Sequence, residues 1–262
     1  MRKMRAPAPP PSAPPPPEGW HGNTTILPPG LLSLMRLDRL FVEHELPAGI
    51  EALRRLDNER RYRVTTAEGE HIYSAIEESS ACGRCCLGRH RDWDFHLVEQ
   101  RPATDRREVL RIARSRRCES CFFPCCLQEM SVYDSASGEL LGTLAQNWNA
   151  LRPSFSVRDA YGEPVLGLKG PLHLRCCGPR ELDFIINSTG KQQSSVGVIT
   201  KKWSSDLARS FFKDGQSIGI GFPVDLDVKI KAVLLGACFL IDFMYFEDND
   251  NGRRRNNHRS CS

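Results

Sequence analysis

Cysteine is the residue type in this chain with the most evident chemistry, because 11 of its 262 residues are cysteines and most of them fall in three clusters. The clusters are Cys82–Cys86, Cys118–Cys126 and Cys176–Cys177. The odd count, and a basic N-terminus that runs into proline rather than an apolar segment, fit a secreted disulfide framework poorly. Lipid attachment, metal binding and burial as free thiols are therefore the chemistries to weigh.

The second cluster has the composition of a lipid-attachment segment. Its cysteines stand beside Phe122, Phe123 and Leu127, and three arginines precede them. An acyl chain contributes about 0.8 kcal/mol per buried methylene, and two chains, or one chain with basic residues, anchor a protein stably. We therefore predict palmitoylation, with buried free cysteines as the alternative. The predicted sites are Cys121, Cys125, Cys126 and Cys118.

A structural zinc site is a second interpretation of the cysteine clusters. Two Cys-x-x-Cys pairs, Cys82 with Cys85 and Cys118 with Cys121, could supply four thiolates. The separation between the pairs exceeds that of zinc ribbons, and adjacent cysteines are awkward ligands for one tetrahedral ion. The sequence shows no general acid–base pair, nucleophile triad or His-Glu-x-x-His motif, so covalent catalysis is disfavoured.

The elements that would position these residues are short strands. Apolar runs recur at intervals of roughly 8–12 residues between turn signals such as Glu68-Gly69, Ser137-Gly138, Tyr161-Gly162 and Thr189-Gly190, which predicts an all-β sandwich or barrel. A short amphipathic helix is predicted over Leu31–Phe41. The predicted strands are Arg61–Thr66, His71–Ile76, Leu127–Tyr133, Leu140–Gln146, Phe155–Arg158, Val165–Lys169, Leu182–Asn187, Val196–Lys201 and Ser217–Phe222.

The segment Val228–Phe246 is the most apolar of the chain and predicts a helix capped by Asp225 or Asp227. From Ala232 its apolar part covers about 22 Å at about 1.5 Å per residue, which is short of the roughly 30 Å of a bilayer core. Asp242 within it would be costly in lipid. A buried core helix is therefore predicted, with a single-pass type II membrane span as the alternative. The residues that mark this helix are Val228, Gly236, Phe239, Asp242 and Phe246.

The two ends of the chain differ in composition from the middle. Residues 1–29 are rich in proline and are expected to form an extended tail, in which Pro14–Pro17 could bind SH3 or WW domains. Residues 30–247 form the predicted domain, and 248–262 a polar, basic tail. The net charge of +4 is mild, so it does not indicate a dedicated nucleic-acid binder, but it permits attraction to an anionic membrane.

Several segments together resemble the phospholipid scramblases, and the similarity runs from about Pro28 to Glu247. The most specific segment is Phe222-Pro-Val-Asp-Leu-Asp-Val228 continuing into Lys231–Glu247. Further matching segments are Leu27–Leu31, Leu37-Asp38, Glu77-Glu78-Ser79, Arg117-Cys118, Pro124–Glu129, Gln146-x-Trp148 and Pro153-x-Phe155.

The resemblance implies a mainly β, Tubby-like fold: a closed antiparallel barrel of about twelve strands around the hydrophobic C-terminal helix. It also implies ATP-independent, Ca²⁺-stimulated, bidirectional movement of phospholipids between leaflets, by a protein anchored through lipid on the cytosolic face of the plasma membrane. A membrane-tethered adaptor without scrambling activity is the alternative.

A weak Ca²⁺ site is implied by the same resemblance, in the loop Asp214–Asp225. Two of its positions are apolar and the terminal bidentate glutamate of an EF-hand is missing, so only low affinity is expected. A strand and turn leading into the helix cap are the alternative structure. The implied ligand positions are Asp214, Gln216, Ile218, Ile220, Phe222 and Asp225.

The resemblance also maps a palmitoylated segment onto Cys121, Cys125 and Cys126. A nuclear-import-like segment maps onto Lys201, Lys202 and Trp203, for which an exposed strand end is the alternative. A nuclear pool and nucleic-acid binding are therefore secondary expectations.

Overall fold

The computed structural model describes residues 28–45, 60–80, 83, 91–100, 107–115, 127–172, 181–190, 194–202 and 217–246, with the side chains of 181 and 202 excepted. These residues form a 3-10 helix, η1 (Pro29–Leu34), twelve strands and one long helix, α4 (Val228–Tyr245). The strands are β1 (Arg39–His44), β2 (Arg61–Thr66), β3 (His71–Glu78), β4 (Trp93–Glu99), β5 (Glu108–Arg114), β6 (Glu129–Asp134), β7 (Leu140–Asn147), β8 (Ser154–Asp159), β9 (Pro164–Lys169), β10 (Glu181–Ser188), β11 (Ser195–Lys202) and β12 (Ser217–Gly221).

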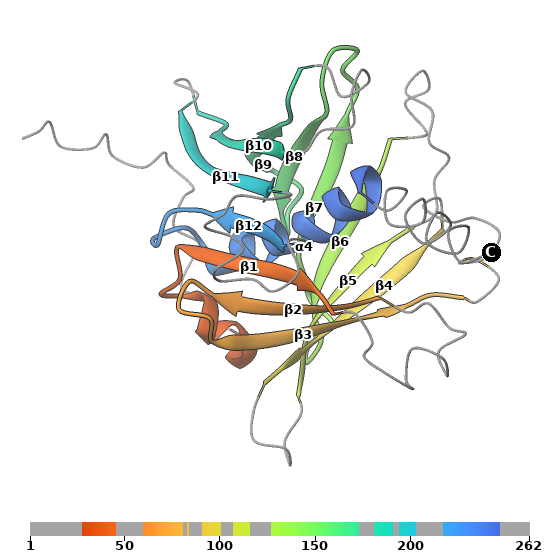
Figure 1. Cartoon of the computed structure of the whole chain (residues 1–262), viewed down its shortest axis with the longest axis vertical. Coiled ribbons are helices and arrows are strands. Elements are labelled where there is room, and N and C mark those ends of the chain that lie inside the picture. The colour runs from red at the N-terminus through yellow and green to blue at the C-terminus, as the bar shows by residue number, and fades with distance from the viewer. Residues whose placement is uncertain are drawn as a thin grey trace, which may run out of the picture.

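The strands close into a barrel that surrounds α4 (Figure 1). Each strand pairs antiparallel with its neighbours in the sequence, and β1 pairs with β12 to complete the ring. Closure pairs every strand on both sides and so removes sheet edges. The predicted fold, a closed antiparallel barrel around a central C-terminal helix, is confirmed.

The barrel core consists of alternate strand residues packed on a helix that is buried all round. In β4, for example, Trp93, Phe95 and Leu97 are buried, whereas the residues between them are half-buried. Every residue of α4 from Ile230 to Met244 is buried. A helix without a polar face needs such an enclosure, and here the strands supply it. The prediction of a core helix is thereby confirmed.

The helix begins where the sequence offers a cap. Asp227 is the N-cap residue, and its side chain accepts hydrogen bonds from the backbone N–H of Lys229 (2.7 Å) and of Ile230 (3.3 Å). Of the two predicted caps, Asp227 therefore serves and Asp225 does not. Within the described ranges, no helix combines the length and the apolar character that crossing a bilayer requires.

Three of the predicted turns contain glycine in the left-handed backbone region. Gly69, Gly138 and Gly162 have φ angles of 83°, 71° and 87°. They link β2 to β3, β6 to β7 and β8 to β9. A residue with a Cβ adopts such angles at a cost that glycine avoids, so these glycines determine where the hairpins turn.

Two expectations for the local structure were wrong. The helix predicted over Leu31–Phe41 ends at Leu34, and Leu40 and Phe41 belong to β1. Pairing of β1 with both β2 and β12 closes the barrel and outweighs the helical spacing of the leucines. Strands β4 and β5 were not predicted, although Trp93, Phe95 and Leu97 of β4 show the alternation typical of a half-buried strand.

Candidate functional site: a charged network inside one end of the barrel

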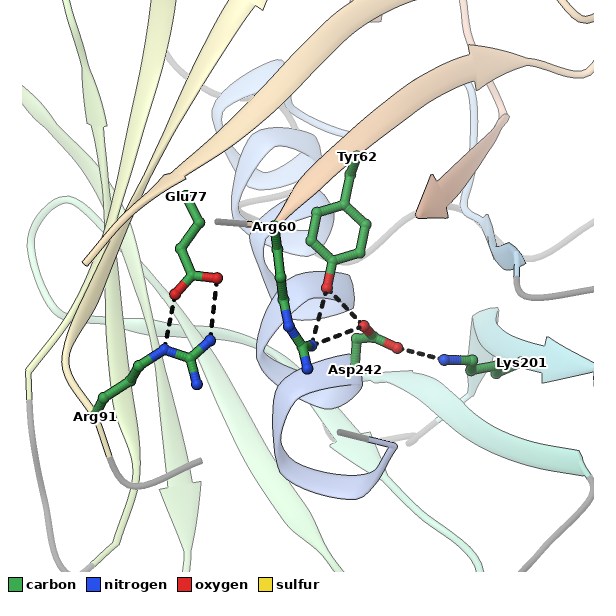
Figure 2. A network of polar contacts seen from close by, with 6 residues as sticks. All are labelled: Arg60, Tyr62, Glu77, Arg91, Lys201 and Asp242. Carbon is green, nitrogen blue, oxygen red and sulfur yellow. Dashed lines mark hydrogen bonds and ion pairs between the residues drawn. The ribbon is translucent and has the colours of Figure 1, made fainter. Parts of the chain in front are cut away.

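Most of the buried charged side chains among the described residues gather at the end of the barrel where α4 finishes, which we call the network end. The opposite end, where Asp227 caps α4, we call the cap end. The network draws on α4 and on several strand ends that are far apart in the sequence (Figure 2). Its described charged members are Arg60, Glu77, Arg91, Arg114, Lys201 and Asp242.

Asp242, in the last turn of α4, is the centre of the network. Its carboxylate accepts a hydrogen bond from the Tyr62 hydroxyl (2.7 Å) and forms an ion pair with the Lys201 ammonium. Arg60 adds a longer ion pair of 3.7 Å between its Nη1 and the Asp242 Oδ2. A buried carboxylate is tolerated only with such partners, because its desolvation would otherwise destabilise the fold.

The surroundings determine the protonation states of this centre. Burial would raise the pKa of Asp242, but the charges of Lys201 and Arg60 and the hydrogen bonds from Lys201 and Tyr62 outweigh it and hold the pKa below its ordinary value. Burial and the neighbouring carboxylate raise the pKa of Tyr62 well above its ordinary value. Neither group changes protonation near neutral pH, so the network is suited to holding α4 rather than to proton transfer.

A second ion pair lies beside the first. The Arg91 guanidinium donates to both carboxylate oxygens of Glu77, at 2.8 Å from Nε and 3.1 Å from Nη2, and both side chains are buried. The Ser79 hydroxyl also donates to Glu77 (2.7 Å). Bidentate geometry of this kind gives both strength and a fixed orientation. The pair therefore joins the end of β3 to the start of β4.

The arginines also surround an aromatic ring of α4. The guanidinium carbons of Arg91, Arg114 and Arg60 lie 4.4, 4.8 and 5.5 Å from the centroid of the Phe243 ring. The Lys201 ammonium lies 4.1 Å from the Phe246 ring centroid. Cations are also favoured at the C-terminal end of a helix by its dipole. The last turn of α4 is thus held by cation–π contacts as well as by ion pairs.

At the cap end, a buried lysine fixes the first turn of α4 to the surrounding backbone. The Lys231 ammonium is buried, and its three N–H groups are shared among four backbone carbonyl oxygens within hydrogen-bond distance, those of Leu34 (3.1 Å), Met35 (3.0 Å), Leu37 (2.8 Å) and Val224 (2.7 Å). Burial lowers its pKa, an effect that nearby Asp225, Asp38 and Asp227 oppose. This carbonyl cage ties η1 and the segment after it to α4.

The implied Ca²⁺ positions are dispersed between strand, turn and core. Ile218 and Ile220 are buried in β12, which is hydrogen-bonded to β1 and β11, and Phe222 is buried just after it. Asp225 lies exposed in the turn before the cap, while Asp214 and Gln216 lie outside the described residues. A strand and turn leading into the helix cap are therefore present. Ca²⁺ binding stays a prediction.

The other predicted site residues fall mostly outside the described residues. Cys118, Cys121, Cys125, Cys126 and Trp203 do so, and palmitoylation and nuclear import stay predictions. Lys202 ends β11, and Lys201 is buried against Asp242. Within the described ranges, no three His, Cys, Asp or Glu side chains gather as a metal site.

Sequence reasoning missed the network and the carbonyl cage. Asp242 stood out in the sequence as an obstacle to membrane insertion, and a carboxylate buried in a core also requires cations to neutralise it. Arginines and lysines at strand ends, such as Arg60, Arg91, Arg114 and Lys201, were the available signal. Lys231, within an otherwise apolar helix, was the corresponding signal at the cap end.

Comparison with known proteins assigns the family. A family model described as Scramblase matches residues 21–248, which include every described helix and strand. Phospholipid scramblase 1 of Mus musculus is 38% identical over 229 residues, which are 87% of this chain and 67% of the relative. Phospholipid scramblase 2 of Bos taurus is 38% identical over 221 residues, 84% of this chain and 72% of the relative.

More distant members match as well, and phospholipid scramblase family member 5 of Homo sapiens is 33% identical over 225 residues, 86% of this chain and 79% of the relative. The chain spans about two thirds of the length of the first relatives, 67% for the mouse and 65% for the rat phospholipid scramblase 1. No solved structure matches significantly. With a family model over nearly the whole chain and these identities, the protein belongs to the phospholipid scramblase family.

Proposed function

We propose that this protein moves phospholipids between the two leaflets of a membrane, without ATP and without covalent chemistry. The observation that carries the proposal is the family match over residues 21–248, which covers the barrel and its central helix together. Weak stimulation by Ca²⁺ is part of the proposal, through the loop Asp214–Asp225, with an affinity in the millimolar range or weaker.

The filled barrel limits where such lipid movement can occur. The residues of α4 from Ile230 to Met244 are buried against inward-facing strand residues, and ion pairs hold the last turn. We therefore place the proposed movement of lipids at the outer surface of the protein against the membrane, while α4 stays in position.

Reconstitution of the purified full-length chain tests the activity. Vesicles carrying a fluorescent phospholipid in both leaflets are treated with dithionite, which bleaches only the outer leaflet. We expect the protein to make inner-leaflet label accessible, faster at millimolar Ca²⁺ than in chelator, with protein-free vesicles as the control. No gain in accessible label, with binding to the vesicles intact, would contradict scrambling.

That contrary result would favour the second function, a membrane-tethered adaptor. The observation that favours an adaptor is that the barrel is closed and its interior is occupied by α4. The tail segment Pro14–Pro17 would then recruit SH3 or WW domains. Pull-down with isolated SH3 and WW domains, before and after substitution of these prolines by alanine, measures that interaction.

Anchoring on the cytosolic face of the plasma membrane is proposed to depend on palmitoylated cysteines. Cells fed a clickable palmitate should label the protein, and replacing Cys121, Cys125 and Cys126 with alanine should remove most of the label. Undiminished labelling of that variant would overturn the assignment. Imaging of the same variant tests the proposed nuclear pool, which should grow as anchoring weakens.

A further inference from the structure

Three exposed apolar side chains lie in two connections at the network end. Trp148 (59% exposed) and Leu151 (73%) lie between β7 and β8, and Leu172 (50%) follows β9. A single exposed apolar residue is unremarkable in a soluble protein. Here three large apolar residues lie on neighbouring loops of one end. The cap end also exposes apolar residues, Leu32, Met35, Tyr161 and Val224, but exposed acidic residues, Asp38, Glu163 and Asp225, lie close to them in the sequence.

Hydrogen bonds show that these connections are neighbours. The backbone N–H of Gly170, which follows β9, donates to the carbonyl of Pro153, which precedes β8 (2.9 Å). On the other side, the N–H of Gln146 donates to the carbonyl of Gln128 (2.8 Å). Gln128 closes the connection from β5 to β6, so three successive connections form one continuous stretch of the barrel end.

In the described parts of the two connections that carry these apolar side chains, the charges have one sign. From Gln146 to Ser154 and from Lys169 to Leu172 the sequence contains no acidic residue, and its two charged side chains are those of Arg152 and Lys169. At the cap end the turns from β2 to β3, from β6 to β7 and from β8 to β9 carry exposed glutamates and no cation, and the exposed Arg36 and Arg39 flank the exposed Asp38 where β1 begins. These glutamates are Glu68, Glu70, Glu139 and Glu163.

We propose that Trp148, Leu151, Arg152, Lys169 and Leu172, here called the lipid rim, form the surface by which the barrel docks on an anionic lipid bilayer. The inference rests on the proposed membrane function and adds which end of the barrel meets the lipid. The three apolar side chains enter the interfacial region, and the two cations attract acidic headgroups. The glutamates of the cap end face away from the anionic surface.

Lipid fits these residues better than a protein partner does. The apolar side chains stand on separate loops, and a fluid bilayer accommodates separate insertions without the packed, complementary core that a protein interface needs. Tryptophan and arginine have apolar bodies with polar ends and suit the headgroup region. Each cation near an anionic membrane surface contributes about 1 kcal/mol to attraction.

The position of the cysteines in the sequence agrees with this orientation. The connection from β5 to β6 leaves the barrel at Ser115 and returns at Leu127, both at the network end. Cys126 precedes Gln128 by two residues in the sequence, and Gln128 is bonded to Gln146 beside the lipid rim. Acylation of that connection and insertion of the lipid rim would act on the same membrane surface.

Strand β8 provides a matched pair of test positions, because Leu151 precedes it and the exposed Tyr161 (91%) follows it at the cap end. The full-length chain, purified without acylation under reducing conditions, is sedimented with phosphatidylcholine vesicles containing phosphatidylserine. We expect Leu151→Glu with Leu172→Glu to reduce partitioning about tenfold or more, through lost apolar burial and added repulsion. Tyr161→Glu should leave partitioning unchanged.

A gain-of-binding variant guards against a folding artefact. Leu151→Trp should strengthen partitioning, and circular dichroism should show that all variants retain the wild-type spectrum. Equal binding of the double variant and of Tyr161→Glu would overturn the inference, as would a wild-type chain that does not bind these vesicles. If the wild-type chain binds through the lipid rim but does not scramble lipids, only the proposed function is contradicted. If the wild-type chain scrambles lipids but the double variant binds as well as wild type, only the docking surface is contradicted.

Discussion

Asp242 shows how one carboxylate can hold a helix inside a barrel. Its carboxylate forms an ion pair with Lys201 of β11 and accepts a hydrogen bond from Tyr62 of β2, so it connects α4 to two strands on different parts of the barrel. Removing one member of a buried pair leaves the other charge without compensation, which is far more destabilising than the loss of an exposed pair.

Asp242→Ala should lower the free energy of unfolding by about 3–5 kcal/mol, because the Lys201 ammonium stays buried without its partner. The matched control is Glu139→Ala, which breaks the more exposed pair with Lys229 at the cap end and should cost about 1 kcal/mol or less. Urea denaturation followed by circular dichroism measures both. Equal losses in the two variants would contradict the role assigned to Asp242.

The lowered pKa of Asp242 makes part of the stability depend on pH. A carboxyl with a depressed folded-state pKa contributes stability that is present above its ordinary value of 3.8 and is lost as the pH falls through the folded-state value. The stability gap between wild type and Asp242→Asn should therefore be constant from neutral pH down to about pH 5 and shrink below about pH 4. Denaturation at a series of pH values checks this, and a gap that widens in acid would refute it.

Replacing Lys231 would affect the free energy of unfolding in two opposing ways. Losing a buried ammonium removes a desolvation cost, but it also removes a donor from four backbone carbonyls, of which that of Leu34 keeps a hydrogen bond from the Leu37 N–H (3.3 Å). We expect the second effect to dominate, so that Lys231→Met costs about 2 kcal/mol. Lys229→Met, two residues away on the same helix, should cost about 0.5 kcal/mol. Thermal unfolding compares them, and a Lys231→Met variant as stable as wild type would reverse the ranking.

At the scale of elements, the close approach of β7 to α4 depends on Gly142. A Cβ built there would lie 2.4 Å from the Arg158 carbonyl oxygen and 2.8 Å from Val233 Cγ2. Gly142→Ala should therefore destabilise the protein by about 1–3 kcal/mol, since backbone and a buried helix residue must move. Gly221→Ala, in β12 with no atom within 4 Å of the added Cβ, should be neutral or slightly stabilising. The difference in urea midpoints between the two variants is the measurement.

Most of the strands and turns could be predicted from patterns of neighbouring residues. Strand β2 was predicted over its full length, and the turns at Gly69, Gly138 and Gly162 were predicted at their residues, because alternation and left-handed glycines are local signals. Strand β1 was mistaken for part of a helix, since its structure depends on pairing with β12, whose residues lie far along the chain. The elements were thus largely predictable, except where distant pairing determines them.

At the scale of the whole molecule, the barrel and the helix should fold as one unit. Each fully buried Val, Leu, Ile, Phe or Met contributes about 1.5–3 kcal/mol, and α4 carries enough of them to match the entire stability of a typical domain, about 5–15 kcal/mol. A chain that ends at Asp227 should therefore show no cooperative unfolding transition by calorimetry. A sharp transition in that truncated chain would mean that the barrel does not need α4.

The all-β class, the apolar C-terminal helix with its Asp cap and the residue order that marks a scramblase could be predicted without the fold. These features follow from neighbours in the chain, through periodicity, capping and turn residues. The folded barrel was needed to show that Asp242 contacts Lys201 and Tyr62, that backbone carbonyls surround Lys231, and that the lipid rim lies at the network end. Such pairings depend on the register and closure of the barrel, where a shift of one residue would turn every side chain of a strand to the other face.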